Sequence, residues 1–177
     1  MRGQPADAAL VAAARSGSDA AFARIVERHQ GPVRGFLRRI CCDESEADDL
    51  AQEVFLDAWT RLRLLSDPAR LKAWLFGIAW RKAKTRARSM GRTRSRESAW
   101  QDLRADSETP QPELALAMQQ ALGQLPPDQR AAVALCLAGG WSHGDAALVL
   151  EMPLGTVKSH VGRGRKRLME ILGVDDE

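Results

Sequence analysis

The segment that decides the fold is Pro153–Leu168, PLGTVKSHVGRGRKRL, which has the pattern of a basic amphipathic helix. A proline suits the first helical position, because its missing N–H would be unpaired there in any case. Val157, Val161 and Leu168 fall on one helical stripe, so this side is expected to pack inward. The remaining surface is polar and mostly cationic, with Lys158, Ser159, Arg163, Lys166 and Arg167.

The residues before this helix, WSHGDAALVL (Trp141–Leu150), predict a partner helix. Ser142 is placed to cap its first turn, and Asp145 to complete a capping box. Glu151 and Met152 then form the turn. Two short helices joined by a tight turn, the second of them cationic, form the helix-turn-helix arrangement whose second helix enters the major groove. A basic helix can also be only a solvated surface, but the cap, the turn and the proline start together favour DNA binding.

Two glycines interrupt the second helix of this motif, and each costs about 1 kcal/mol relative to alanine inside a helix. We interpret Gly162 and Gly164 as positions that permit a close approach of the backbone. The residues expected to contact DNA from this helix are Thr156, Lys158, Ser159, Gly162, Arg163 and Lys166.

Composition places the chain among globular proteins, and the distribution of charge indicates its partners. The chain has 177 residues, of which 45% are hydrophobic, and a net charge of +3. Asp43–Asp57 contains acids without Lys or Arg, whereas Arg81–Arg96 contains cations without an acid. Opposite charge blocks predict partners of opposite charge.

Several classes of protein are not favoured by the sequence. Cys41 and Cys42 are adjacent and Cys136 lies in an apolar run, so we expect buried thiols in a reducing compartment and no disulfide framework. No His–Cys spacing suits a metal, and we expect no metal and no cofactor. GTVKS lacks the first glycine of a phosphate loop, so no enzyme is predicted. No apolar run suits a membrane span or a signal peptide, which predicts a cytoplasmic protein without membrane insertion of its own.

Helix signals predominate along the chain, and we predict an all-α fold of two small helical domains joined by a flexible linker. The expected domains are 1–92 and 114–177, with the linker at 93–113, where apolar periodicity is lost. Trp100 and Leu103 inside the linker are expected to dock or to become ordered on a partner. The expected helices follow Ser18, Pro32, Ser45 with Asp48 as a capping box, Asp67 with Pro68, and then span 114–122 and 128–137.

The helix expected from Ser45 to about Leu64 has an acidic outer face with Asp49, Gln52 and Glu53. Like charges disfavour nucleic acid there, so this face needs a protein partner or water. Its buried stripe is expected to include Leu50, Val54, Ala58 and Leu62.

The cationic block continues a helix whose earlier turns carry aromatic side chains. Arg81, Lys84 and Arg88 can hold phosphates, and an exposed Trp80 could stack on an unpaired base. This combination suits DNA that is being opened. The alternative for Trp80 is core packing, and for Trp74 we favour core packing.

Three blocks in this order resemble the extracytoplasmic function sigma factors, the two-domain factors that direct bacterial RNA polymerase to promoters. ADDLAQEVFLDAW (Ala47–Trp59) is similar to their core-polymerase-binding helix. LKAWLFGIAWRKAKTRAR (Leu71–Arg88) resembles their promoter-melting and downstream-element helix, and Leu125–Leu168 their upstream-element domain. The resemblance covers nearly the whole chain.

The resemblance implies a role for each surface. Asp49, Gln52 and Glu53 would meet the clamp coiled coil of the largest polymerase subunit. Lys158, Ser159 and Arg163 would approach the minus-35 element, and the helix with Trp80, Arg81, Lys84 and Arg88 the downstream element. An anti-sigma factor would be a further partner. Arg81 stands where the family often has Asn, and Gly162 where a larger residue is common. The alternative function is a free-standing helix-turn-helix regulator that acts without polymerase.

Overall fold

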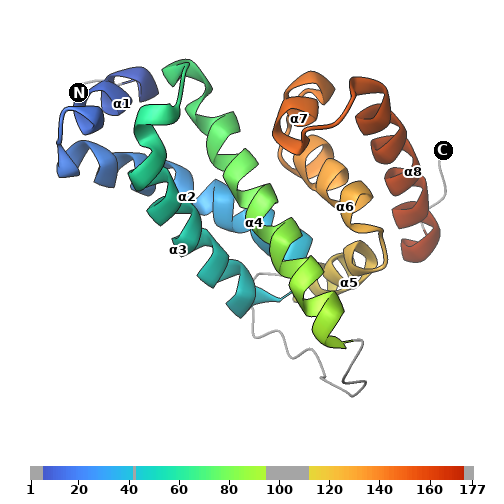
Figure 1. Cartoon of the computed structure of the whole chain (residues 1–177). Helices are drawn as coiled ribbons and strands as arrows, with labels where there is room; N and C mark the ends of the chain where they lie inside the picture. The colour runs from blue at the N-terminus through green and yellow to red at the C-terminus, as the bar shows by residue number, and fades with distance from the viewer. Residues whose placement is uncertain (1–5, 42, 95–111, 174–177) are drawn as a thin grey trace.

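The computed structural model describes residues 6–41, 43–94 and 112–173, and of residues 90–94 and 112–115 the backbone alone. Every regular element in these ranges is helical, which confirms the all-α prediction. In chain order the α-helices are α1 (Asp7–Arg15), α2 (Asp19–Cys41), α3 (Glu44–Arg61), α4 (Leu71–Arg94), α5 (Pro112–Gly123), α6 (Pro127–Val133), α7 (His143–Leu150) and α8 (Leu154–Leu172). Figure 1 shows α1–α4 grouped on one side and α5–α8 on the other.

Helix α1 precedes the first helix that the sequence predicts. Leu10, Val11 and Ala14 bury its inner side, with 0–6% of each side chain exposed. Arg15 at its end donates hydrogen bonds to the carbonyl oxygens of Leu62, at 3.2 Å, and Leu65. These contacts fix α1 to the segment between α3 and α4.

Helix α2 is continuous through Pro32, so the prediction of separate helices after Ser18 and after Pro32 was wrong. A proline inside a helix removes a backbone hydrogen bond and costs about 3 kcal/mol. Ile25, Val33 and Leu37, on either side of the proline, are fully buried. Each contributes about 1.5–3 kcal/mol by burial, so the packing of both halves outweighs the cost.

Helix α3 begins two residues earlier than the predicted cap at Ser45 implies. The carboxylate of Asp43 accepts a hydrogen bond from the backbone N–H of Glu46 at 2.8 Å, so Asp43 is the cap, not Ser45 with Asp48. An extended backbone at Asp43 places its side chain over the first free N–H groups. The predicted buried stripe is confirmed: Leu50, Val54, Ala58 and Leu62 are all buried.

Asp67 caps a short 3-10 turn, η2 (Pro68–Arg70), which leads directly into α4; its carboxylate accepts from the N–H of Ala69 at 2.9 Å as expected. The helix extends to Arg94, and α5 begins at Pro112. The two helices therefore occupy the first and last residues of the segment predicted as linker. Trp100 and Leu103 lie outside the described residues, and the domain boundaries stay a prediction.

The second domain contains the predicted helix-turn-helix, α7 and α8. The hydroxyl of Ser142 accepts from the N–H of Asp145 at 3.0 Å and donates to its carboxylate at 2.6 Å. Glu151 ends α7 in the left-handed region, with φ of 55°. Pro153 is the residue before the first turn of α8 and not its first helical residue. Helix α6 continues into a π-helical turn, η3 (Ala134–Ala138).

The two glycines of α8 have different surroundings. A Cβ built on Gly164 would lie 2.5 Å from Cγ2 of Val133 on α6, so only glycine allows this approach of the two helices. Nothing lies within 4 Å of a Cβ at Gly162. Close packing therefore explains Gly164 and does not explain Gly162.

The two domains pack directly against each other. One buried apolar cluster contains side chains from both, among them Phe76 and Trp80 of α4 and Val149 and Leu150 of α7. Helix α4 lies between α3 and the second domain, as Figure 1 shows. Any surface of α4 that faces the second domain is therefore covered in this arrangement.

Candidate nucleic-acid and polymerase interfaces

Helix α8 presents a cationic face to solvent. Its inner stripe of Val157, Val161 and Leu168 is buried as predicted, with 0–7% of each side chain exposed. The predicted DNA-contacting residues lie on the other side: Lys158, Ser159, Gly162, Arg163 and Lys166 are exposed, and Thr156 is half-buried. The guanidinium of Arg163 donates within the helix to the carbonyl oxygen of Ser159, at 3.4 Å.

The charges of this face remain available to a phosphate backbone. Among the residues that the structure describes, no acid lies within ion-pair distance of Lys158, Arg163 or Lys166. Arg167, farther along α8, pairs with Glu170 at 3.1 Å. The two domains thus leave the predicted recognition surface open.

The cationic side of α4, unlike that of α8, is largely occupied by acidic side chains of the second domain. Arg81 forms an ion pair with Glu151 of the second domain, with 2.6 Å between Nη1 and Oε1. Lys84 lies 3.8 Å from the carboxylate of Asp128, also in the second domain. Arg88 is exposed, without an acidic partner in the described part of the chain. Two of the three cations expected to hold downstream DNA are therefore paired within the molecule.

Trp80 is a core residue and not an exposed stacking platform. Only 4% of it is exposed, and it belongs to the apolar cluster. The ammonium of Lys84 lies 5.3 Å from the centre of its ring. The prediction that Trp80 offers a free face to an unpaired base does not hold in this arrangement, because the side chain is buried in the apolar cluster that both domains share. Trp74 is half-buried against the same cluster, as expected.

The acidic face of α3 is split between solvent and α4. Asp49 and Gln52 are exposed, as expected. Glu53 instead turns toward α4, where its carboxylate lies 3.2 Å from Lys82 and 3.4 Å from Arg86. Opposite charges on two adjacent helices attract each other. The acidic block on α3 and the basic block on α4 therefore neutralise each other where the two helices meet.

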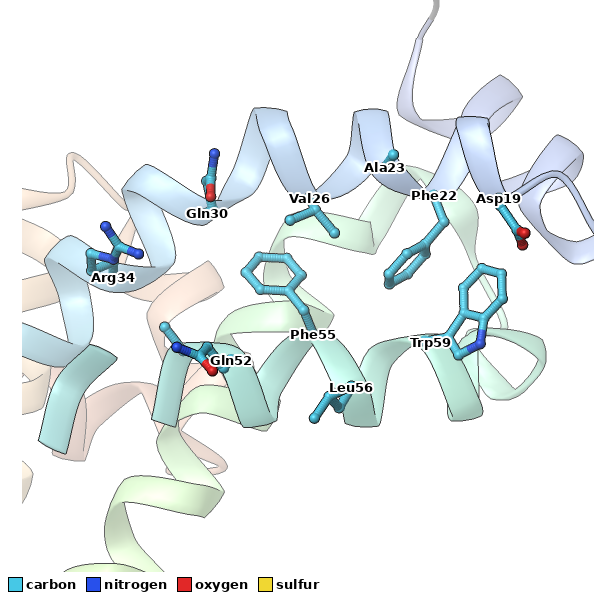
Figure 2. A pocket seen from close by; sticks show the side chains of 11 residues that line it. Asp19, Phe22, Ala23, Val26, Gln30, Arg34, Gln52, Phe55, Leu56 and Trp59 are labelled. Carbon is cyan, nitrogen blue, oxygen red and sulfur yellow. The ribbon is translucent and has the colours of Figure 1, made fainter. Parts of the chain in front are cut away.

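An apolar groove that the sequence did not predict runs beside Gln52, between α2 and α3 (Figure 2). It has a volume of about 530 Å³. Phe22 and Trp59 meet edge to face at its end, with ring centres 4.7 Å apart. Figure 2 shows the side chains that line the groove from α2 and α3; the large apolar ones among them are Phe22, Val26, Phe55, Leu56 and Trp59.

Exposed apolar side chains on α3 mark this groove. Leu56 is 68% exposed and Trp59 is 42% exposed. Gln52, Leu56 and Trp59 recur at helical spacing beside the buried stripe, which is the signal that sequence reasoning could have used. Apolar side chains left open in a concave surface commonly serve a protein partner.

The titratable groups of the described residues offer no catalytic constellation. Burial lowers the pKa of His29, against the opposing effect of the Asp7 carboxylate 3.0 Å away. Burial raises the pKa of the Cys136 thiol. Cys41 and Cys136 are only half-buried, so the prediction of buried thiols was wrong for both; Cys42 lies outside the described residues. The described segments contain no cluster of metal-ligating side chains, and none of their helices could span a membrane.

The fold and these surfaces define a class: a two-domain helical protein with a helix-turn-helix whose cationic face is open, and a separate apolar and acidic face suited to a protein. Comparison with known families agrees. Residues 25–93 match the model of sigma-70 region 2, and residues 115–168 match the model of sigma-70 region 4. The chain belongs to the extracytoplasmic function sigma factors, the class of factors that direct promoter-specific initiation by RNA polymerase.

Individual relatives extend over nearly the whole chain. The ECF RNA polymerase sigma factor SigM of Mycobacterium tuberculosis is 33% identical, over 97% of this chain and 87% of its own length. The RNA polymerase sigma-H factor of Pseudomonas aeruginosa is 30% identical, over 97% and 96%. Among solved structures, the sigma factor RpoE of Bartonella quintana, in complex with the anti-sigma factor NepR, has a TM-score of 0.78 at 30% identity, over 88% and 98%. Nothing in these comparisons favours a free-standing regulator.

Proposed function

We propose that this sigma factor divides its work among three surfaces, and that core polymerase supplies all the catalysis. The α2–α3 groove with Asp49 and Gln52 docks core polymerase, α8 reads the upstream promoter element, and the cationic side of α4 holds downstream DNA. The observation that carries the proposal is the open cationic face of α8, on the opposite side of that helix from its buried stripe. We place this work in the cytoplasm, where a bacterial polymerase meets its template.

Polymerase docking rests on the combination of apolar and acidic groups on one helix. Desolvated aromatic and aliphatic side chains give most of the affinity of a protein interface, and rim charges set its orientation. Leu56 and Trp59 supply the apolar side chains, and Asp49 supplies the charge at the rim. Glu53 contributes less than the sequence suggested, because Lys82 and Arg86 already pair with it.

Upstream recognition rests on α8. Arg or Lys can pair with guanine edges in the major groove, and a good bidentate contact gives about 1–3 kcal/mol of discrimination. Lys158, Ser159 and Arg163 lie on the exposed side of the first turns, where such a helix meets base edges. Lys166 lies farther along and suits a phosphate. Gly162 leaves open space on this face, so it permits a close approach without adding a contact.

Regulation by an anti-sigma factor is the second part of the proposal. RpoE, which has the same fold at 30% identity, was solved with its anti-sigma factor NepR. We infer that a comparable partner covers surfaces of this chain.

Site-specific photocrosslinking tests the assignment of surfaces. A photoreactive amino acid at Gln52 is expected to crosslink to the largest subunit of core polymerase, and one at Ser159 to duplex upstream DNA in the holoenzyme–promoter complex. The same amino acid at Glu27, exposed on α2 outside the groove, serves as the control. Crosslinking of the Gln52 variant to DNA, or equal crosslinking of all three to polymerase, would overturn the assignment.

A further inference from the structure

The guanidinium of Arg81 lies against its own helix, α4, at the level of Gly77, one turn back. A Cβ built on Gly77 would lie 3.6 Å from Nη1 and 4.0 Å from Nη2 of Arg81, so both terminal nitrogens are at contact distance from this position. Because glycine has no side chain, the guanidinium can lie broadside on the helix there. Its location is therefore defined, although 49% of the side chain is exposed.

The hydrogen-bond donors of Arg81 are directed away from α4. Nη1 donates to a carboxylate oxygen of Glu151 at 2.6 Å, so a planar oxygen acceptor reaches the guanidinium from outside the helix. Arg39 on α2 provides a comparison, because it has the same four-residue spacing from a glycine, Gly35. Arg39 donates to the carbonyl oxygen of Gly35 at 2.9 Å. Arg39 thus uses a donor on its own helix, whereas Arg81 offers one to another group.

The neighbouring cations of α4 are suited to other tasks. Lys82 and Arg86 pair with an acid of α3, at 3.2 and 3.4 Å from the carboxylate of Glu53. Lys84 carries a point charge, which suits a phosphate, and Arg88 lies exposed farther along the helix. A guanidinium whose position is defined instead matches two neighbouring acceptors with its planar fork of N–H groups.

Trp74 and Thr85 lie on the same face of α4 as Arg81, because seven and four positions separate them from it. Trp74 is half-buried against the apolar cluster, and Thr85 is exposed. The guanidinium, at the level of Gly77, lies between these two side chains along the helix. An unpaired base that meets Arg81 therefore has an aromatic ring beside it, and stacking on such a ring stabilises it.

We propose that Arg81 reads a guanine in the downstream promoter element and does not only hold a phosphate. The inference rests on the proposed role of α4 in holding downstream DNA. Guanine presents two neighbouring acceptors, O6 and N7, and their bidentate contact is the commonest specific one between a protein and a base. The carboxylate of Glu151 presents a similar pair of acceptors in one plane. Lys84 and Arg88, on phosphates, then position the strand.

Selection of DNA by the reconstituted holoenzyme tests the inference. A library of forked promoter DNA, randomised over the downstream element, is bound by holoenzymes that contain wild type, Arg81→Lys or Arg39→Lys, and the bound DNA is sequenced. Wild type should enrich guanine at one position by roughly 5- to 150-fold, the range of a good bidentate contact. Arg81→Lys keeps the charge but loses the fork, so it should lose the preference at this position alone. Arg39→Lys should keep the preference.

Salt dependence separates base reading from phosphate holding. A cation that neutralises a phosphate contributes about 0.9 to the slope of log K against log salt. Arg88→Gln should therefore lower the slope by about this amount for every sequence. Arg81→Gln should leave the slope near that of wild type and weaken binding only to DNA with the preferred guanine.

The inference is overturned if wild-type holoenzyme enriches no guanine, if Arg81→Lys retains the preference, or if Arg81→Gln weakens all sequences equally and lowers the slope as Arg88→Gln does. Transcription by the same holoenzymes separates this test from that of the proposed function. Defined transcripts without a guanine preference refute only the role of Arg81, whereas a wild-type holoenzyme that gives no transcript refutes the proposed function.

Discussion

Glu53 of α3 and Lys82 of α4 form an ion pair, with 3.2 Å between Oε2 and Nζ, on the seam where the acidic and basic helices meet. The pair turns Glu53 away from the outer face of α3. The surface that we propose for polymerase therefore consists of Asp49 and Gln52 together with the apolar groove beside them. In this proposal, charge and apolar surface together define the polymerase-binding face.

Reversing the charge of Asp49 should abolish tight binding to core polymerase. Asp49→Arg adds a cation where an acid orients the interface, and like charges across an interface cost several kcal/mol. Fluorescence anisotropy with labelled factor gives the affinity, and Glu27→Arg is the control at another exposed acid of the same domain. Equal affinity of Asp49→Arg and wild type would show that this face is not the interface.

Truncating the groove should weaken polymerase binding without unfolding the domain. Leu56 is 68% exposed, so alanine there removes little buried surface from the free protein. Trp59 is 42% exposed and packs edge to face on Phe22, so its truncation also removes a contact at the edge of the domain. An aromatic anchor in an interface commonly contributes about 2 kcal/mol or more, so Trp59→Ala should lose roughly thirtyfold in affinity. Leu64→Ala, at an apolar side chain that is 76% exposed outside the groove, should bind normally. A normal affinity of Trp59→Ala would refute a role of the groove in docking.

The glycines of α8 should respond in opposite directions to alanine. In Gly164→Ala the new methyl group would lie 2.5 Å from Val133, and overpacking of this kind costs about 1–3 kcal/mol. In Gly162→Ala the methyl group has open space, and alanine favours the helix by about 1 kcal/mol. Thermal unfolding should therefore give a lower Tm for the first and a higher Tm for the second. Equal effects of the two would mean that α6 and α8 are not this close.

Acid should destabilise the first domain through His29. Burial holds its pKa below the ordinary 6.5, so the unfolded chain takes up a proton at a pH where the folded chain does not. The stability is fully present above pH 6.5 and decreases as the pH falls from there toward the folded pKa. Urea unfolding across this window measures the loss, and His29→Gln should flatten it while the exposed His143→Gln should not. An unchanged pH dependence in His29→Gln would exclude this histidine as the cause.

Local patterns predicted much of the fold, and contacts distant in sequence account for the rest. The stripe of Val157, Val161 and Leu168 and the Ser142 cap depend on residues within one or two turns, so the sequence contained them. The continuity of α2 through Pro32 depends on packing against other helices, which overrides the local preference against proline. Helix α1 was missed although it is rich in alanine, the residue with the highest helix propensity.

The candidate site divides in the same way. The cationic face of α8 follows from helical spacing and was predicted residue by residue. The pairing of Arg81 with Glu151 joins residues on different domains, and the burial of Trp80 requires the three-dimensional arrangement of α4. The groove was missed because its two walls belong to different helices, α2 and α3, and their packing against each other cannot be deduced from the local pattern of either one.

Mapping of transcripts made by purified core polymerase with this chain tests the central claim most directly. The account predicts RNA with defined 5′ ends from a set of promoters when the chain is present, none from core alone, and loss of that RNA with Asp49→Arg. Tight and specific promoter binding by the chain without polymerase, combined with no transcript in its presence, would contradict the account.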